Sequence, residues 1–209
     1  METTTWLTFF AASWAISISP GPGAIASMSA GLNHGFAYGY VTIFGLVLGI
    51  WTQLLIVGVG LGALMATSAT AFVVVKWLGV AYLVWLGIQQ WRAPARPMVA
   101  VSDSRQLVTQ RALIAKAWMV NVVNPKGTVF LLAVVPQFIS PAEPLLAQYL
   151  IIGATLAFTD MVVMAGYTAM ASRVLGALKE PAHIRAINRI FGGLFVLAGS
   201  LLALFKRSI

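Results

Sequence analysis

The sequence predicts an all-α, polytopic membrane protein in which six transmembrane helices form one domain over residues 1–209. Hydrophobic residues make up 60% of the chain and charged residues only 9%. A soluble domain carries about 25% charged residues, and a soluble fold could not cover its surface with so few. The other two observations are a series of long apolar segments and a match between the two halves of the chain.

Six segments reach the length of a transmembrane helix, which needs about 20 mainly apolar residues. They lie at about residues 6–26, 37–65, 73–91, 113–138, 145–171 and 187–205. No positive charge precedes the first segment, so we interpret it as a spanning helix rather than a cleaved signal peptide.

Basic residues are concentrated in the connections after the third and fifth segments. The connections at 66–70 and 140–144 contain no Lys or Arg. Cytoplasmic loops carry the excess of Lys and Arg, so both termini are predicted to be external, although Lys206 and Arg207 at the C-terminus oppose this orientation. The basic loops on the predicted cytoplasmic side thus explain the net charge of +8. Nucleic acid is therefore not an expected partner.

The two halves of the chain carry matching motifs. The repeats are predicted at about 6–91 and 112–206, joined by a cytoplasmic linker at 92–111. Three spans in each half would make the copies inverted relative to each other, an arrangement typical of secondary transporters. The matching motifs in the third and sixth segments are Lys76-x-x-Gly79-x-x-Tyr82 and Arg189-x-x-Gly192-x-x-Phe195.

The first and fourth segments are interrupted at corresponding places. The first contains Ser19, Pro20, Gly21 and Pro22, and the fourth contains Asn124, Pro125 and Lys126. A proline inside a helix removes a backbone hydrogen bond, and Pro20 and Pro125 lie about 21 and 18 Å into their segments at 1.5 Å per residue. Because the hydrocarbon core is about 30 Å thick, both breaks are predicted to line a substrate path within the membrane.

Asp160 is the only acidic residue inside a predicted span, and Lys126 lies at a similar depth in the neighbouring span. Intramembrane charges are costly and usually paired or functional. Two alternatives stay open. The pair could hold the hairpin of the fourth and fifth spans together. Alternatively, Asp160 could bind the ammonium group and Lys126 the carboxylate of a zwitterion, with protonation of Asp160 coupling transport to a proton gradient.

Three amide side chains complete the predicted substrate path: Gln53, Asn121 and Asn124. They suit an amino-acid site but could equally form hydrogen bonds between helices. The spacing of Gly45 with Gly49 and of Gly58 with Gly62 allows close helix approach, either within the chain or in a homodimer.

The sequence offers little for a metal, a cofactor or catalysis. The chain has no Cys, and His34 and His183 lie far apart in predicted loops, so no metal site or cofactor is expected. One deep carboxylate, one deep lysine and scattered hydroxyls are too few for an enzyme. A passive channel would explain the helix breaks, but it has less need of ionisable groups at mid-depth than a secondary exporter has.

Several motifs together resemble the lysine-exporter (LysE) superfamily over nearly the whole chain. They are residues 19–23 (SPGPG), 76–83 (KWLGVAYL), 124–126 (NPK) and 136–138 (PQF). Residues 29–35, 57–62, 85–92 and 188–192 are most similar to its homoserine/threonine-resistance (RhtB) branch and to homoserine and homoserine-lactone efflux proteins within it.

The resemblance implies a bacterial inner-membrane exporter of small neutral amino acids or derivatives, driven by the proton gradient. Many relatives carry an aspartate after the glycine of the second span, whereas Ile50 follows Gly49 here. If that aspartate couples transport in relatives, Asp160 must serve alone in this chain.

Overall fold

In the computed structural model the described residues are 2–65, 69–94, 109–140, 142–171, 173 and 180–204, and their only regular secondary structure is helical. This confirms the all-α prediction. Most of the predicted linker, and Lys206 and Arg207, lie outside the described residues. The helices are α1 (Thr3–Ile18), α2 (Pro22–His34), α3 (Phe36–Met65), α4 (Ala69–Arg92), α5 (Gln110–Val122), α6 (Pro125–Phe138), α7 (Leu145–Ala169) and α9 (Pro181–Leu204).

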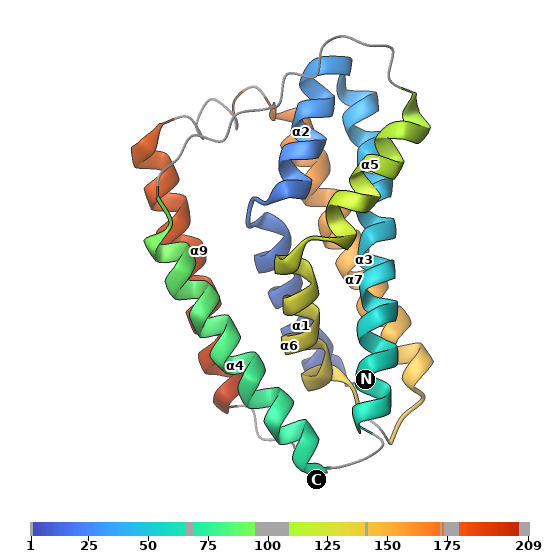
Figure 1. Ribbon diagram of the computed structural model, residues 1–209, viewed down its shortest axis with the longest axis vertical. Helices are drawn as coiled ribbons and strands as arrows, with labels where there is room; N and C mark the ends of the chain where they lie inside the picture. The colour runs from blue at the N-terminus through green and yellow to red at the C-terminus, as the bar shows by residue number, and fades with distance from the viewer. Residues whose placement is uncertain are drawn as a thin grey trace.

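Two of the predicted spans are each divided into two helices. The first becomes α1 and α2, and the fourth becomes α5 and α6, which meet at an angle of 53°. Pro22 and Pro125 are each the first residue of the second helix of their pair, the position where a missing N–H costs least. Both breaks lie near the middle of the molecule's long axis (Figure 1), and their depth in a bilayer stays a prediction.

By length and composition, α3 and α7 are the described helices that could each cross a bilayer unaided. The bent pair α5–α6 counts as a third span if it is read as one. In Figure 1 the chain runs up through α1 and α2, down through α3, up through α4, down through α5 and α6, up through α7 and down through α9. This path of the chain is compatible with six spans in two inverted repeats, but that architecture stays a prediction.

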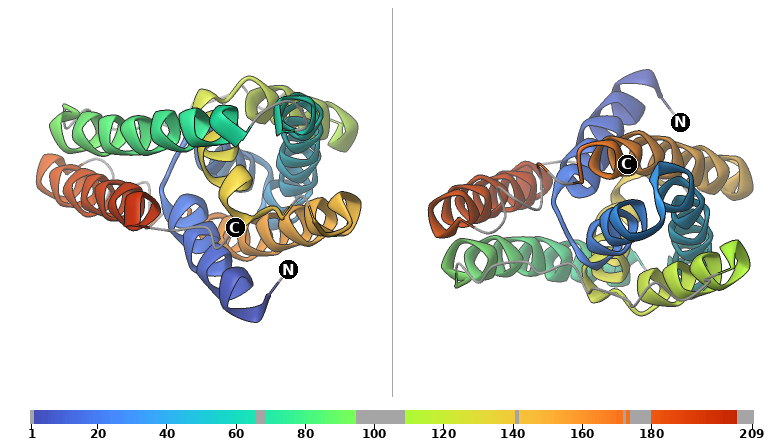
Figure 2. Two further views of the ribbon diagram at one scale, coloured as in Figure 1. Left: turned by 90° about the horizontal axis from the view of Figure 1, so that it is seen from below. Right: turned by 90° about the horizontal axis from the view of Figure 1, so that it is seen from above.

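The helices form two groups. α4 and α9 pack along each other and stand beside a compact group made of α1, α2, α3, α5, α6 and α7 (Figure 2). At the crossing of α4 and α9, a Cβ on Gly87 would lie 2.6 Å from the carbonyl oxygen of Gly192. Only glycine allows these two backbones to approach so closely. α6 connects the groups because it also packs against α4.

Two apolar clusters lie on opposite sides of the helix breaks. The upper cluster, in the half that holds α2 and α5, comprises Ala24, Met28, Ile43, Leu46, Ala117, Met164 and Ala171. The lower cluster, in the half that holds α1 and α6, includes Phe9, Leu54, Leu83, Phe130, Leu131, Val135, Phe138, Ile152, Leu156 and Phe195. The breaks therefore form a polar layer between two well-packed apolar regions.

Many large apolar side chains face outward. On α3 and α7, for example, Leu55, Val59 and Leu146 are 68%, 68% and 73% exposed. A soluble monomer rarely exposes apolar surface of this extent, whereas lipid covers it at no cost. The exposed surface thus supports the membrane class that the composition predicted.

Candidate functional site

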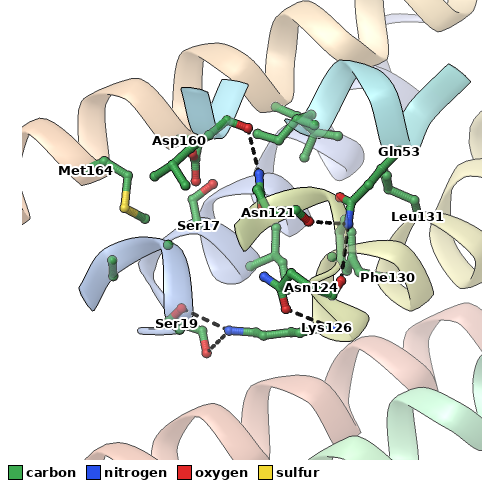
Figure 3. Close-up of a pocket in the computed structure, with 18 residues that line it drawn as sticks. Ser17, Ser19, Gln53, Asn121, Asn124, Lys126, Phe130, Leu131, Asp160 and Met164 are labelled. Carbon is green, nitrogen blue, oxygen red and sulfur yellow. Dashed lines mark hydrogen bonds between the residues drawn. The ribbon is translucent and has the colours of Figure 1, made fainter. Parts of the chain in front are cut away.

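A cavity of about 80 Å³ lies between the two helix breaks (Figure 3). Its polar lining comes from both halves of the chain and consists of Ser17, Ser19, Gln53, Asn121, Asn124, Lys126 and Asp160. Ala24, Leu46 and Met164 of the upper cluster line it from one side, and Phe130, Leu131 and Leu156 of the lower cluster from the other. Since one water needs roughly 10–15 Å³ of such space, several waters or a small polar solute fit between the clusters.

The break between α1 and α2 leaves carbonyl groups at the end of α1 without helical partners, because Pro20 and Pro22 have no N–H to donate. The Lys126 Nζ donates to the Ser19 carbonyl oxygen at 2.9 Å and to the Ser19 Oγ at 2.6 Å. The Tyr167 hydroxyl of α7 donates to the carbonyl oxygen of Ile18. A cation at a helix C-terminus also interacts favourably with the helix dipole, so Lys126 stabilises this break.

The break between α5 and α6 is completed by a glutamine from the other half of the chain. The Gln53 Nε2 donates to the Asn121 carbonyl oxygen at 2.7 Å and to the Thr128 Oγ1 at 2.8 Å, and it lies 3.2 Å from the Asn124 carbonyl oxygen. The Asn124 Oδ1 accepts from the Lys126 backbone N–H and caps α6. At each break, side chains from the opposite half of the chain thus donate hydrogen bonds to some of the free carbonyl groups. Backbone groups buried in a membrane require such partners because lipid offers none.

Asp160 lies in the middle of α7 and reaches the cavity with a half-buried side chain. On the preceding residue, the Thr159 hydroxyl lies 3.2 Å from the Ser17 hydroxyl, which ties α7 to the end of α1. The Asp160 carboxylate makes no hydrogen bond and no ion pair to any described residue, and the Lys126 ammonium is held by Ser19 instead. The direct ion pair that one alternative expected is therefore not formed here, and both charged groups face the same space.

A side chain of α9 also reaches this site. The Lys126 Nζ lies 5.6 Å from the centre of the Phe195 ring, within the range of a cation–π interaction. Phe195 belongs to the lower cluster, so the cation of the polar layer is in contact with the α4–α9 group. A movement of that group would change the surroundings of Lys126 directly.

The structure brings most of the predicted path residues together. Ser19, Gly21, Gln53, Asn121, Asn124, Lys126 and Asp160 line the cavity. Pro20, Pro22 and Pro125 create the breaks but do not line it. The use of these residues in transport stays a prediction.

Asn121 acts at least partly between helices, because its Nδ2 donates to the Leu46 carbonyl oxygen at 2.6 Å. Sequence reasoning missed Ser17 and Tyr167. A hydroxyl one turn before the break, and another one turn from the end of α7, were the available signals.

Replacing Gln53 by Leu is expected to destabilise the protein by about 1–3 kcal/mol, the cost of leaving buried carbonyl groups without donors. Thermal unfolding of the purified protein in detergent measures the effect as a lower Tm. Gln89→Leu is the matched control, because Gln89 is exposed on α4. If both variants unfold at the wild-type temperature, Gln53 does not support the break.

The fold and this site define a class of protein. Two broken helices meet at a cavity with ionisable side chains, between two apolar clusters and under an apolar exterior, as in a membrane transporter. The LysE type translocator family model matches residues 14–205. The chain therefore belongs to the LysE type translocator family.

Curated relatives agree with the family. The chain is 46% identical to a homoserine/homoserine lactone efflux protein of Salmonella typhimurium over 95% of each chain. It is 42% identical to an uncharacterized membrane protein of Vibrio cholerae over 99% of this chain and all of that one. A leucine efflux protein of Enterobacter sp. (strain 638) is 26% identical over 90% of each chain. No solved structure matches the chain.

Proposed function

We propose that this protein is a secondary exporter of small neutral amino acids or their derivatives, such as homoserine, homoserine lactone and threonine. The observation that carries the proposal is the cavity between the two helix breaks, with Lys126 and Asp160 both in its lining. The 46% identity to a homoserine/homoserine lactone efflux protein supports the substrate class.

A zwitterion fits the chemistry of this cavity. Asp160 offers an unpaired carboxylate for the ammonium group, and Lys126 offers a cation for the carboxylate. Gly23 and Ala24, at the start of α2, also line the cavity, and backbone N–H groups of a first helical turn have no partners within their own helix. Helix N-termini at a midplane break are a recurrent site for the carboxylate of transported amino acids.

The two apolar clusters suit transport by alternating access. Each cluster closes one side of the polar layer. Parting the upper cluster would open the cavity toward one face of the membrane while the lower cluster stays closed, and the reverse movement would open it toward the other face. Proton coupling would follow if Asp160 binds either a proton or the substrate ammonium group.

Counterflow of labelled homoserine into proteoliposomes tests the function. An exporter should exchange homoserine across the membrane, and a pH gradient should drive its accumulation. A passive channel would equilibrate the label without any response to the gradient. Failure to exchange any neutral amino acid would contradict the proposal altogether.

The orientation belongs to the same proposal, namely six spans in a bacterial inner membrane with both termini external. In Figure 1 the first turns of α5 and α9 both lie in the upper half of the molecule, and they carry Arg111 and Arg185. Positive charge at this end favours a cytoplasmic location. The lower end holds the start of α1.

Single cysteines in the naturally Cys-free chain test this orientation. An impermeant maleimide should label Glu2→Cys in intact spheroplasts and should label Arg185→Cys only after the membrane is permeabilised, since both native side chains are exposed but lie at opposite ends. The reverse labelling pattern would show that the termini are cytoplasmic.

A further inference from the structure

Three amide side chains line the central cavity, and each uses only one end of its amide on the backbone. The Gln53 Nε2 donates to the Asn121 carbonyl oxygen at 2.7 Å. The Asn121 Nδ2 donates to the Leu46 carbonyl oxygen at 2.6 Å, and the Asn124 Oδ1 accepts from the Lys126 backbone N–H at 3.1 Å. Because a carbonyl oxygen only accepts and a backbone N–H only donates, these bonds fix the orientation of all three amides.

The other end of each amide is available to a ligand. The Gln53 Oε1, the Asn121 Oδ1 and the Asn124 Nδ2 form no hydrogen bond to any described residue. Within the described part of the chain, the buried polar side-chain atoms that have neither a partner nor accessible surface are the Ser29 Oγ and the Gln137 Nε2. The three amide ends are therefore not sealed off, and the residues that carry them all line the cavity.

Two of these ends lie with the charged groups of the cavity. In the view of Figure 3, Asn121 lies on the side of Asp160 and Asn124 on the side of Lys126. The Asn124 Nδ2 can thus donate to a substrate carboxylate together with Lys126, and the Asn121 Oδ1 can accept from a substrate ammonium group together with Asp160. The Gln53 Oε1 is left as an acceptor that neither end of a zwitterion requires.

The space in front of the Gln53 Oε1 is open because residue 127 is a glycine. A Cβ at Gly127 would lie 2.9 Å from this oxygen and 3.4 Å from the Nε2. The amide is not free to swing aside, since its Nε2 is held by the Asn121 carbonyl oxygen and by the Thr128 Oγ1. Gly127 itself lines the cavity, so the space that a Cβ would fill belongs to the cavity.

An uncharged acceptor in this position distinguishes between substrate side chains. Ile50, three residues before Gln53 on the same face of α3, also lines the cavity and suits methylene groups. An aliphatic substrate would bury the Gln53 Oε1 without a donor, which is unfavourable, whereas a hydroxyl group supplies one. Sites that hydrogen-bond a substrate hydroxyl reject the analogue without it far more strongly than apolar pockets reject a missing methylene.

We propose that Gln53 determines specificity in this cavity. Its Oε1 accepts a hydrogen bond from the side-chain hydroxyl of the substrate, so the site selects hydroxylated amino acids such as homoserine over aliphatic ones of the same size. Gly127 leaves the room for that hydroxyl. The inference rests on the proposed function and deepens it, because it gives Gln53 a second task. The Nε2 holds the break between α5 and α6, and the Oε1 recognises the substrate.

Homoserine and norvaline are a matched pair for the test, because they have nearly the same size and differ by a hydroxyl in place of a methyl group. Exchange of each labelled solute into proteoliposomes is measured below saturation, and the ratio of the two rates is the readout. The wild type should exchange homoserine at least about tenfold faster, since norvaline leaves a buried acceptor without a donor. Gly127→Ala should bring the ratio close to one, because its methyl group covers the Oε1.

The ratio separates recognition from size and from stability. A smaller cavity alone, or an ammonium group rather than a hydroxyl at the Gln53 Oε1, would make Gly127→Ala slow both solutes alike and would keep the wild-type ratio. Gln53→Leu removes the same acceptor without filling the space, and it decides the question should Gly127→Ala not fold. Its lower stability affects both solutes equally, so its ratio should also be close to one.

Gly60→Ala is the control on the same helix as Gln53. Its added methyl group meets nothing within 4 Å and lies outside the lining of the cavity, so this variant should keep the wild-type ratio.

Equal exchange of the two solutes by the wild type would overturn the assignment of Gln53 and leave the exporter function standing. A wild-type ratio in either folded variant, Gly127→Ala or Gln53→Leu, would do the same. Exchange of neither solute by the wild type would instead contradict the exporter function and this inference with it. The two failures are therefore distinguishable.

Discussion

Replacing Asp160 by Asn is expected to reduce homoserine counterflow by at least about 100-fold, the effect of losing one charge–charge interaction of a few kcal/mol at short range. Asn has nearly the same shape and can still hydrogen-bond, but it neither attracts an ammonium group electrostatically nor binds a proton. Asp160 is the carboxylate of the central cavity, and among the described residues it forms no hydrogen bond or ion pair. Both the affinity for the ammonium group and the response to a pH gradient should therefore be lost together.

The folded state should survive this substitution. A half-buried carboxylate without a hydrogen bond or a direct ion pair is unfavourable inside a membrane, so the Tm of Asp160→Asn should equal or exceed that of the wild type. Glu2→Gln, at the exposed N-terminal end, is the matched control and should transport normally. An Asp160→Asn variant with wild-type counterflow and accumulation would eliminate the proposed role, and one that fails to fold would assign Asp160 a structural role.

Replacing Gly45 by Ala is expected to destabilise the protein by about 1–3 kcal/mol or more, the usual cost of overpacking. A Cβ on Gly45 would lie 2.2 Å from the carbonyl oxygen of Ile114 and 2.8 Å from the Cβ of Ala117. Neither atom can rotate away, so α3 and α5 would have to separate. Asn121, whose Cβ lies 2.6 Å from the corresponding position at Gly49, would be displaced from the site with α5.

Gly60→Ala on the same helix provides the control with the opposite sign. A Cβ at Gly60 meets nothing within 4 Å, and alanine favours a helix over glycine by about 1 kcal/mol. The Tm of Gly60→Ala should therefore be equal or higher, while that of Gly45→Ala falls and its counterflow decreases. Equal melting temperatures for the two variants would contradict the close α3–α5 contact.

The positions of the glycines in the structure also show how the two glycine pairs of α3 are used. The sequence left open whether they allow close packing within the chain or in a homodimer. Gly45 and Gly49 both face α5, so they are used within the chain. Gly58 faces the ring of Tyr149 on α7. Spacing alone could not distinguish these alternatives, because it places two glycines on one face of a helix without indicating which helix that face meets.

Much of the fold could be predicted because it depends on local chemistry. The low fraction of charged residues indicated the membrane, and apolar length located the helices, although α2 runs eight residues beyond the predicted end of the first span and α9 begins six residues before the predicted start of the sixth. Pro22 and Pro125 fixed where helices restart, since proline lacks an N–H wherever it stands. Counting residues along neighbouring helices placed Asp160 and Lys126 at the same level, and both line the central cavity.

The partners of the polar groups were decided by the tertiary structure alone. Lys126 was expected to meet Asp160 or a substrate, yet its ammonium lies on Ser19, 107 residues away in the chain. Gln53 was a candidate for substrate binding, and it holds the carbonyl groups that the break after α5 leaves free. A sequence shows which backbone groups a proline leaves without partners. Which side chain reaches them depends on how the helices pack, because in hydrocarbon any donor from any helix can satisfy the same need.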